Sequence, residues 1–257
     1  MTSKAKVLLL REPTPSSDSD QDRYEAAFAA AKYTPFSIPV LETVLTNITE
    51  LASVTKQSDF DGVIVTSARS CEAWDKANGT ERDEFPFYVV GKATASTLRS
   101  SMPNADIRGE SSGTAEQLAN FILAEPPRPP TKLLYLTGDK NRDTLPNILG
   151  GAGVSLHSLK VYETQGSSTF SLQLKEIVPV RPTVPWWIVF FAPSAAEFVL
   201  PFLREQFDLD TVKVAVIGPT TATFLREILG LRVDAIPTKP SAEELLRAII
   251  DADATPL

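Results

Sequence analysis

The strongest constraint on this chain is an internal duplication. The stretch YVVGKATAS at residues 88–96 and the stretch AVIGPTTAT at residues 215–223 share an apolar run, a glycine and a Thr-Ala pair. Gly91 and Gly218 lie 127 residues apart, and Thr94 and Thr221 have the same separation. A constant offset that continues for about thirty residues indicates two copies of one strand–helix unit.

The duplication extends upstream of both copies. DGVIVTSARSCEAW (61–74) is similar to PWWIVFFAPSAAEFV (185–199), and KVLLLRE (6–12) is similar to KLLYLTG (132–138). Each of the latter two leads to a strand that ends in Glu-Thr, FSIPVLET (36–43) and HSLKVYET (157–164). The chain therefore has the order A, B, A′, B′, where A and A′ are one repeat and B and B′ another.

Short apolar runs alternate with helical segments along the whole chain. Runs rich in Val, Ile and Leu predict buried parallel strands at 6–10, 62–66, 87–91, 132–136, 187–191 and 213–217. Helices are expected at 20–33, 114–125 and 241–252, the last two beginning with Thr or Ser followed by Glu as capping residues. This pattern predicts an α/β fold built from flavodoxin-like units with parallel sheets.

Two arrangements fit the order A, B, A′, B′. In the first, A with B and A′ with B′ form tandem domains. In the second, B and A′ form one domain, and the two chain ends, A and B′, form the other. The second arrangement makes the chain cross twice, at the two Glu-Thr strands, which could pair as a two-stranded hinge. The repeats alone do not choose between them.

Composition narrows the class of partner. The formal net charge is −7, which makes nucleic acid a poor default partner, because phosphate binding usually requires a basic face. No run approaches the ~18 apolar residues of a membrane helix, so we expect a cytoplasmic protein without a membrane partner. Cys71 and His157 are the only residues of their kinds. We expect a buried thiol and a solvent-facing strand histidine, and neither a metal site nor a Cys/His dyad.

The ordered motifs resemble those of the uroporphyrinogen-III synthase family along nearly the full length. They are KVLLLRE, IPVLET, VIVTSAR, YVVGKATA, GDKNRDTLP, KVYET, FFAPSA, AVIGPTTA and PSAEELLRAI. The resemblance implies two flavodoxin-like domains joined by a two-stranded β-ladder hinge, which favours the second arrangement. The implied boundaries are 1–37 with 168–257 for domain 1, 44–160 for domain 2, and 38–43 with 161–167 for the linker.

The resemblance also implies an activity. Family members cyclise the linear tetrapyrrole hydroxymethylbilane to uroporphyrinogen III, with inversion of ring D and loss of water, in haem biosynthesis. It implies a lyase that uses no cofactor and no metal. We further expect a monomer that can receive its substrate by transient handover from hydroxymethylbilane synthase.

Site residues follow from the same motifs. The resemblance makes Tyr162 the candidate that assists loss of the hydroxyl group. Candidate substrate-binding residues end or follow predicted strands: Arg11, Thr66, Ser67, Arg69, Gly91, Lys92, Thr94, Arg142, Ser194, Gly218, Thr220 and Thr221. Family members often have Ser-Pro after the first strand of each B unit, whereas this chain has Ser67-Ala68 and Ala192-Pro193.

The residues support these roles to different degrees. Turns from a strand into a helix offer free backbone N–H groups and a favourable dipole for carboxylates. The threonines of the duplicated turns could donate hydroxyl groups to substrate or could only cap helices. Tyr162 could equally be a packing residue, although its counterpart in the other copy is Leu41. We expect the duplicated turns to grip opposite parts of one polycarboxylate, and to do so asymmetrically.

Two other function classes, a binding protein without catalysis and a nucleotide-binding enzyme, make different predictions. A two-lobed binding protein without catalysis would show ligand protection without turnover. A nucleotide-binding enzyme is disfavoured because the chain contains neither G-x-G-x-x-G nor G-x-x-x-x-G-K-[ST].

Overall fold

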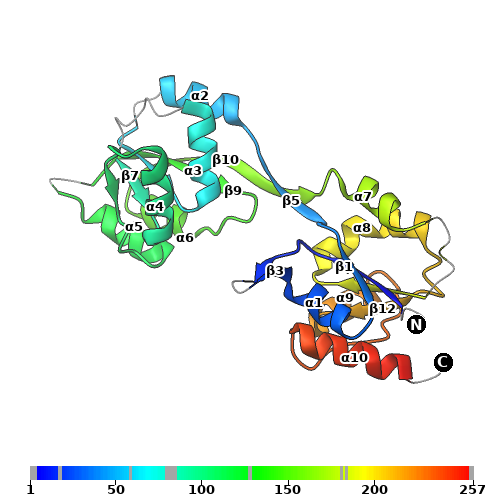
Figure 1. Cartoon of the computed structure of the whole chain (residues 1–257). Helices are drawn as coiled ribbons and strands as arrows, with labels where there is room; N and C mark the ends of the chain where they lie inside the picture. The colour runs from blue at the N-terminus through cyan, green and yellow to red at the C-terminus, as the bar shows by residue number, and fades with distance from the viewer. Residues whose placement is uncertain are drawn as a thin grey trace. The chain divides into compact units, whose positions relative to one another are not determined.

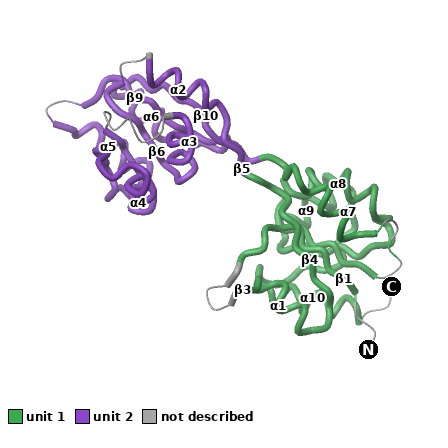
Figure 2. The backbone as a smooth tube through the Cα atoms, turned by 45° about the horizontal axis from the view of Figure 1, so that its top comes forward, with its two compact units in different colours: residues 1–42, 165–257 green, residues 43–164 purple. Residues whose placement is uncertain are grey.

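A computed structural model describes residues 5–16, 19–57, 60–78, 86–126, 129–179, 182 and 185–254. The chain divides into two compact units (Figure 2). Unit 1 contains residues 1–42 and 165–257, and unit 2 contains residues 43–164. Both chain ends belong to unit 1, where Figure 1 marks them. Each unit has its own sheet and its own apolar clusters.

The sheet of unit 1 is parallel throughout. Its strands are β1 (Lys6–Leu10), β4 (Thr34–Ser37), β11 (Trp186–Phe190) and β12 (Lys213–Val216), in the spatial order β12-β11-β1-β4. A single parallel bridge between Ala215 and Ala235 adds a fifth position beside β12. Numbered along the chain, the order is 2-1-3-4-5, which is the flavodoxin-like order.

Alternate residues of β1 point to opposite faces of this sheet, as a strand requires. Leu8 and Leu10 pack in the cluster that contains α7 (Phe170–Ile177), α8 (Pro193–Gln206) and α9 (Pro219–Glu227). Val7 and Leu9 pack with α1 (Arg23–Ala30) and α10 (Ala242–Ala254) on the other face. Helices therefore cover both faces, which explains why the strands are continuous apolar runs. A small antiparallel pair, β2 (Pro15–Ser16) with β3 (Ser19–Asp22), precedes α1.

Unit 2 has the same architecture, but the two repeats that build it occur along the chain in the opposite order from those of unit 1. Its sheet has the order β5-β10-β9-β6-β7-β8, built from β5 (Leu41–Leu45), β6 (Gly62–Val65), β7 (Phe87–Val89), β8 (Ile107–Arg108), β9 (Lys132–Gly138) and β10 (Ser155–Gly166). The pairs from β10 to β8 are parallel. If β9 and β10 are numbered 1 and 2, and β6, β7 and β8 are numbered 3, 4 and 5, the spatial order from β10 to β8 is again 2-1-3-4-5. The two units therefore share one topology.

Helices also cover both faces of the unit 2 sheet. The cluster on one face joins β6, β7, β9 and β10 to α2 (Ile48–Gln57), α3 (Ala68–Asn78) and α4 (Gly91–Ser101). The cluster on the other face includes α5 (Ala115–Leu123) and α6 (Thr144–Gly151). Trp74 and Phe87 are fully buried in the first cluster and pack edge to face, with ring centroids 5.1 Å apart.

Strands β5 and β10 are the two chain segments that run from one unit into the other. The Thr46 N–H donates to the Val161 carbonyl at 2.9 Å, and the Ser167 N–H donates to the Val40 carbonyl at 3.0 Å. Residue numbers rise on one strand as they fall on the other, so the pair is antiparallel. The Glu42 carboxylate accepts from the Ser168 N–H and from Gln165 Nε2, which fastens the unit 1 end of this ladder.

The expected fold class, two flavodoxin-like parallel-sheet domains with a two-stranded ladder, is confirmed. The capping prediction is also confirmed, because Thr114 Oγ1 accepts from the Gln117 N–H and Ser241 Oγ accepts from the Glu244 N–H. The predicted start of the first helix at residue 20 is wrong. Helix α1 begins at Arg23 because Asp22 is its N-cap and accepts from the Tyr24 and Glu25 N–H groups.

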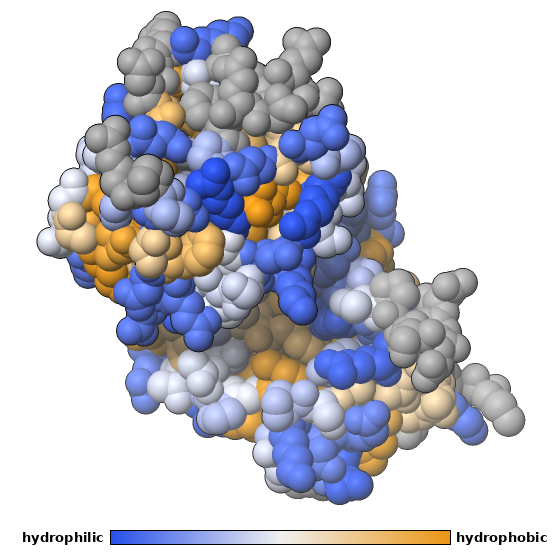
Figure 3. Space-filling view, turned by 90° about the vertical axis from the view of Figure 1, so that its left-hand side faces the viewer, coloured by the Kyte–Doolittle hydropathy of each residue, from blue (hydrophilic) through white to orange (hydrophobic). Residues whose placement is uncertain are grey.

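In the space-filling view of Figure 3, hydrophilic residues cover much of the visible face and surround smaller hydrophobic patches. Among the described residues, the most exposed large apolar side chains are Ile228 at 68% and Leu172 at 62%. No helix within the described ranges is long and apolar enough to cross a membrane.

The carboxylate of Asp253 fastens the last helix of unit 1 to the amino edge of its sheet. It accepts hydrogen bonds from the Tyr33 hydroxyl at 2.6 Å, Lys213 Nζ at 2.8 Å and Trp187 Nε1 at 3.2 Å. Burial by itself would raise the pKa of Asp253, but these three donors outweigh burial and lower it. Burial and the hydrogen bond to Asp253 raise the pKa of Tyr33, which remains a donor.

We predict that Asp253→Asn lowers the free energy of unfolding by about 1–2 kcal/mol at pH 7, because hydrogen bonds to a charged acceptor are lost. The lowered pKa means that the stabilisation is present above the ordinary aspartate value of 3.8 and is lost as the pH falls through the lowered value. Urea unfolding at pH 7 and at successively lower pH measures this. A gap between wild type and variant that stays constant on acidification would contradict the assignment.

Candidate functional site

The predicted site residues follow strands at the carboxyl edges of the two sheets, apart from Tyr162, which lies within β10. In unit 2, Thr66, Ser67 and Arg69 follow β6, whereas residues 91–94 begin α4 after β7. Arg142 follows β9. In unit 1, Arg11 follows β1, Ser194 lies in the first turn of α8, and residues 218–221 begin α9. In open parallel α/β sheets this edge is where ligands bind.

Tyr162 is held by two neighbours within unit 2, Gly138 and Arg69. It pairs with Gly138 in the β9–β10 register, which shifts between Lys160 and Tyr162. Its ring occupies the space where a side chain at position 138 would begin. The Arg69 guanidinium lies 6.0 Å from the ring centroid, close enough for a cation–π attraction. The half-buried phenol is therefore fixed beside an exposed positive charge.

A second tyrosine supports the same edge of unit 2, and the sequence analysis missed it. The Tyr135 hydroxyl donates to Asn141 Oδ1 at 2.8 Å. Burial raises the pKa of Tyr135, hydrogen bonds with Thr66 and Asn141 lower it, and the nearby Tyr162 raises it, with a net increase. The hydroxyl therefore stays protonated and ties the loop that carries Arg142 to the end of β6. A tyrosine within the apolar run KLLYLTG was the available signal.

Ser67 already has a structural partner. Its Oγ accepts from the Ser70 N–H at 3.2 Å and lies 3.1 Å from Ser70 Oγ, while Ser70 Oγ donates to the Leu136 carbonyl. Ser67 thus caps α3 and, through Ser70, links this helix to β9.

The duplicated turns differ in their backbone. Gly91 has φ of +81°, a left-handed conformation that favours glycine. Gly218 is extended, with φ of −178°, and a Cβ at that position would meet nothing within 4 Å. The fold therefore requires glycine at position 91 for its conformation and has no such requirement at position 218.

The threonines of these turns are not helix caps. The N-cap residues are Val90 for α4 and Gly218 for α9, and neither helix has a side-chain cap. Thr94 and Thr221 are buried, at 6% and 4% exposure, whereas Lys92 and Thr220 are exposed. The N-cap of α8 is Ala192, again without a side-chain cap, and Ser194 is exposed. Three helix starts thus keep free N–H donors.

Arg11 is used within unit 1. Its Nη1 lies 2.5 Å from Asp22 Oδ2, its guanidinium stacks 4.8 Å from the Tyr24 ring centroid, and its side chain is only 16% exposed. Asp22 also accepts from the Thr14 N–H at 2.8 Å. Burial alone would raise the pKa of Asp22, but Arg11 and the backbone donors lower it. This ion pair stabilises the start of α1.

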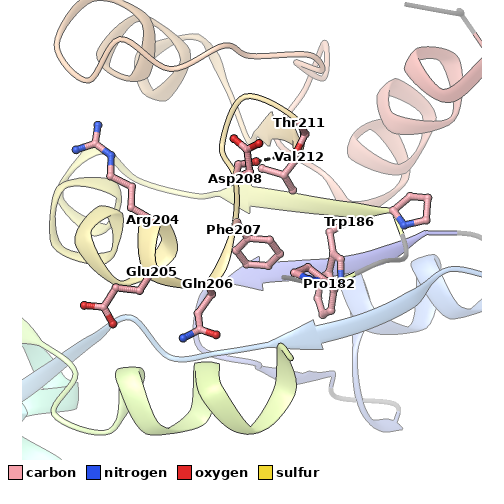
Figure 4. Close-up of a pocket in the computed structure, with 10 residues that line it drawn as sticks. Pro182, Trp186, Arg204, Glu205, Gln206, Phe207, Asp208, Thr211 and Val212 are labelled. Carbon is pink, nitrogen blue, oxygen red and sulfur yellow. Dashed lines mark hydrogen bonds between the residues drawn. The ribbon is translucent and has the colours of Figure 1, made fainter. Parts of the chain in front are cut away.

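A pocket of about 550 Å³ is found at the amino edge of the unit 1 sheet, where Trp186 begins β11 and Phe207 follows α8. Figure 4 shows Phe207 close to Trp186, with Arg204 and Glu205 pointing away; the two rings have centroids 5.6 Å apart. None of the predicted site residues lines this pocket.

The lone cysteine and histidine take the places expected from the sequence. Cys71 is buried, and burial, followed by the nearby charge of Asp75, raises the pKa of its thiol to about 12, so it is not a nucleophile at neutral pH. His157 is an exposed residue of β10 beside Phe60. In the part of the chain that the structure describes, no group of three His, Cys, Asp or Glu residues is arranged to hold a metal ion.

Comparison with known proteins identifies relatives along most of the chain. The family model described as Uroporphyrinogen-III synthase HemD matches residues 22–247. The uroporphyrinogen-III synthase of Schizosaccharomyces pombe is 33% identical over 247 residues, covering 90% of this chain and 92% of that protein. The Saccharomyces cerevisiae protein of the same name is 26% identical and covers 96% of each chain.

Two solved structures of uroporphyrinogen-III synthases are also similar to this chain. The uroporphyrinogen-III synthetase of Helicobacter pylori 26695 aligns with a TM-score of 0.48 at 19% identity, covering 96% of this chain and 99% of that one. A Thermus thermophilus uroporphyrinogen III synthase aligns with a TM-score of 0.42 at 18% identity, covering 97% and 99%.

Arg11 is paired with a buried carboxylate and Arg142 is exposed, so substitution of the two residues should affect stability to different extents. Arg11→Met should lower the free energy of unfolding by about 3 kcal/mol, because it leaves the buried Asp22 carboxylate without its cation. Arg142→Met, at an exposed position, should change it by less than about 0.5 kcal/mol. Urea unfolding at neutral pH measures both. Equal effects of the two substitutions would show that the Arg11–Asp22 pair does not stabilise unit 1.

Proposed function

Because the chain belongs to the uroporphyrinogen-III synthase family, we propose that the polar groups at the carboxyl edges of both its sheets bind hydroxymethylbilane. The family reaction is the cyclisation of that linear tetrapyrrole to uroporphyrinogen III in tetrapyrrole biosynthesis, and the chain is a lyase of this kind. The single observation that carries the proposal is the Tyr162 phenol fixed beside Arg69 at such an edge.

Free N–H groups supply part of the binding in this proposal. The substrate carries eight carboxylates, and the chain has a net charge of −7, so overall charge opposes binding and local donors must overcome it. The uncapped starts of α4, α8 and α9 support this role, because N–H groups and the helix dipole both favour anions there. The open space around Gly218 lets a ligand approach the backbone closely.

Exposed side chains supply the remaining contacts. Arg69, Lys92 and Arg142 carry unburied positive charges, and Ser194 and Thr220 offer exposed hydroxyls. Thr66 and Ser67 line the turn after β6, and the buried Thr94 and Thr221 lie one turn inside α4 and α9. Arg11 remains a predicted contact that would have to keep its ion pair with Asp22 while it binds.

Tyr162 acts on the departing hydroxyl group in this mechanism. The hydroxyl of the terminal hydroxymethyl group leaves as water when its oxygen accepts a proton, and the methylene carbon remains as part of an azafulvene cation. The phenol can donate a hydrogen bond to that oxygen, and its ring face can stabilise nearby positive charge. The substituted carbon of ring D then attacks the cation and forms a spirocyclic intermediate, which rearranges to the inverted ring. Holding the chain for this attack supplies much of the catalysis.

The direct test is product identity. Purified protein should convert enzymatically generated hydroxymethylbilane to the type III isomer, resolved by chromatography. Formation of the type I isomer alone would overturn the proposal, because uncatalysed closure gives that symmetric product.

We predict that Tyr162→Phe lowers kcat by roughly tenfold to a hundredfold, because the ring stays and the proton donor is lost. Single-turnover rates and the ratio of type III to type I product measure the effect. Tyr33→Phe is the matched control: it removes a phenol hydroxyl at the amino edge of unit 1, where it bonds Asp253, and should leave the rate unchanged. An unchanged rate for Tyr162→Phe would remove the hydroxyl from the chemistry.

We predict that Arg69→Met, Lys92→Met and Arg142→Met each raise KM by about threefold to tenfold, as expected for one partly screened charge contact. The increase should become smaller at high salt. Lys175→Met removes the same charge from α7, away from the carboxyl edge, and serves as the control. If the three variants and this control gave the same KM, the charges would have no role in binding.

Three further properties belong to this proposal. The enzyme acts as a monomer, works in the cytoplasm and receives its unstable substrate by transient handover from hydroxymethylbilane synthase. The absence of a disulfide partner for Cys71 supports a reducing compartment. Sedimentation at several protein concentrations tests the first property.

A further inference from the structure

Gly138 ends β9 at the place where the Tyr162 ring lies. A Cβ built at position 138 would lie 2.5 Å from Cζ and 2.8 Å from the hydroxyl oxygen of Tyr162, and would also contact Cε2. Real Cβ atoms essentially never approach other atoms below 3.0 Å. The ring and any side chain at position 138 therefore exclude each other.

The backbone does not explain this glycine. Gly138 is not among the residues with positive φ, so other residues could adopt its conformation. It is also the last residue of β9, where it pairs in parallel with Tyr162 of β10. Glycine is required at this position because the Tyr162 ring occupies the space that a side chain would fill.

A strand irregularity brings Tyr162 to this position. Lys160 pairs with Thr137 and Tyr162 pairs with Gly138, so two steps along β10 match one step along β9. Such β-bulges redirect side chains and are common beside active sites. Without the extra residue, Val161 would pair with Gly138 and Tyr162 would pass beyond it.

The other copy of the repeat provides an internal comparison. The positions that correspond to Gly138 and Tyr162 in the first repeat are Glu12 and Leu41. The glycine and the tyrosine are therefore present together in one copy and absent together from the other. Tyr135, whose hydroxyl is bonded to Asn141, similarly corresponds to Leu9.

We infer that Gly138 is a positioning residue for the reaction. Together with the bulge at Val161, it provides the space that holds the Tyr162 phenol beside Arg69. This inference rests on the proposed role of Tyr162. The Cε2, Cζ and hydroxyl atoms of the Tyr162 ring lie against the glycine, the phenol is near Tyr135, and the Arg69 guanidinium lies 6.0 Å from the ring centroid.

The test is a double-mutant cycle on the full chain with Gly138→Ala, Tyr162→Ala and the double variant. The alanine methyl should displace the phenol by on the order of 1 Å, which can lower kcat by about a hundredfold with a much smaller change in KM. In the double variant the ring is gone, so Gly138→Ala should cause no further loss of kcat and little loss of Tm. Gly150→Ala is the control, because its Cβ meets nothing within 4 Å, and activity should be unchanged.

A spectroscopic readout separates positioning from general damage. With 3-fluorotyrosine incorporated, the ¹⁹F resonance of Tyr162, assigned by its loss in Tyr162→Phe, should shift in Gly138→Ala and stay in place in Gly150→Ala. Wild-type kcat and an unshifted resonance in Gly138→Ala would overturn the inference. Wild-type kcat in Tyr162→Ala would instead overturn the role proposed for Tyr162. Equal losses from Gly138→Ala in the presence and absence of the ring would show that the glycine acts on the fold and not on the phenol.

Discussion

The parallel direction of the core strands is the constraint on which the rest of this structure depends. Each strand returns to the sheet through a helix that covers a face, so the core strands become apolar on both sides. Polar groups are then confined to the strand ends, and every strand-to-helix turn of a unit falls at one edge. The positions of Arg69 and Lys92 in unit 2 and of Ser194 in unit 1 follow from this direction alone.

The two copies of this scaffold carry different chemistry. In unit 2, the end of β9 provides Gly138 and the neighbouring strand β10 provides Tyr162. Unit 1 has Glu12 and Leu41 at the matching positions. Arg11 of unit 1 neutralises the buried Asp22 that caps α1. The duplicated frame therefore supplies strand-to-helix turns in both units. In the proposed function these turns bind carboxylates, whereas the Tyr162 phenol of unit 2 acts at one end of the substrate.

The stability of unit 1 also depends on carboxylates whose charges are matched internally. Asp22 fastens the first helix and Asp253 fastens the last one, each through several donors. Because both pKa values are lowered, these attachments weaken together on acidification. The exposed cations Arg69 and Arg142 of unit 2 form no ion pair among the described contacts, so their charges are available for the substrate in the proposed function.

The sequence by itself determined the parallel α/β class, the repeat order and the caps at Thr114 and Ser241, because strand periodicity and helix capping depend on residues close in the chain. It also determined which residues follow each strand. Only the tertiary structure decided that Tyr162 lies on Gly138 and that Tyr135 bonds Asn141. Those contacts depend on the register and bulge between two strands, and register is set by packing across the sheet, not by the local sequence of either strand.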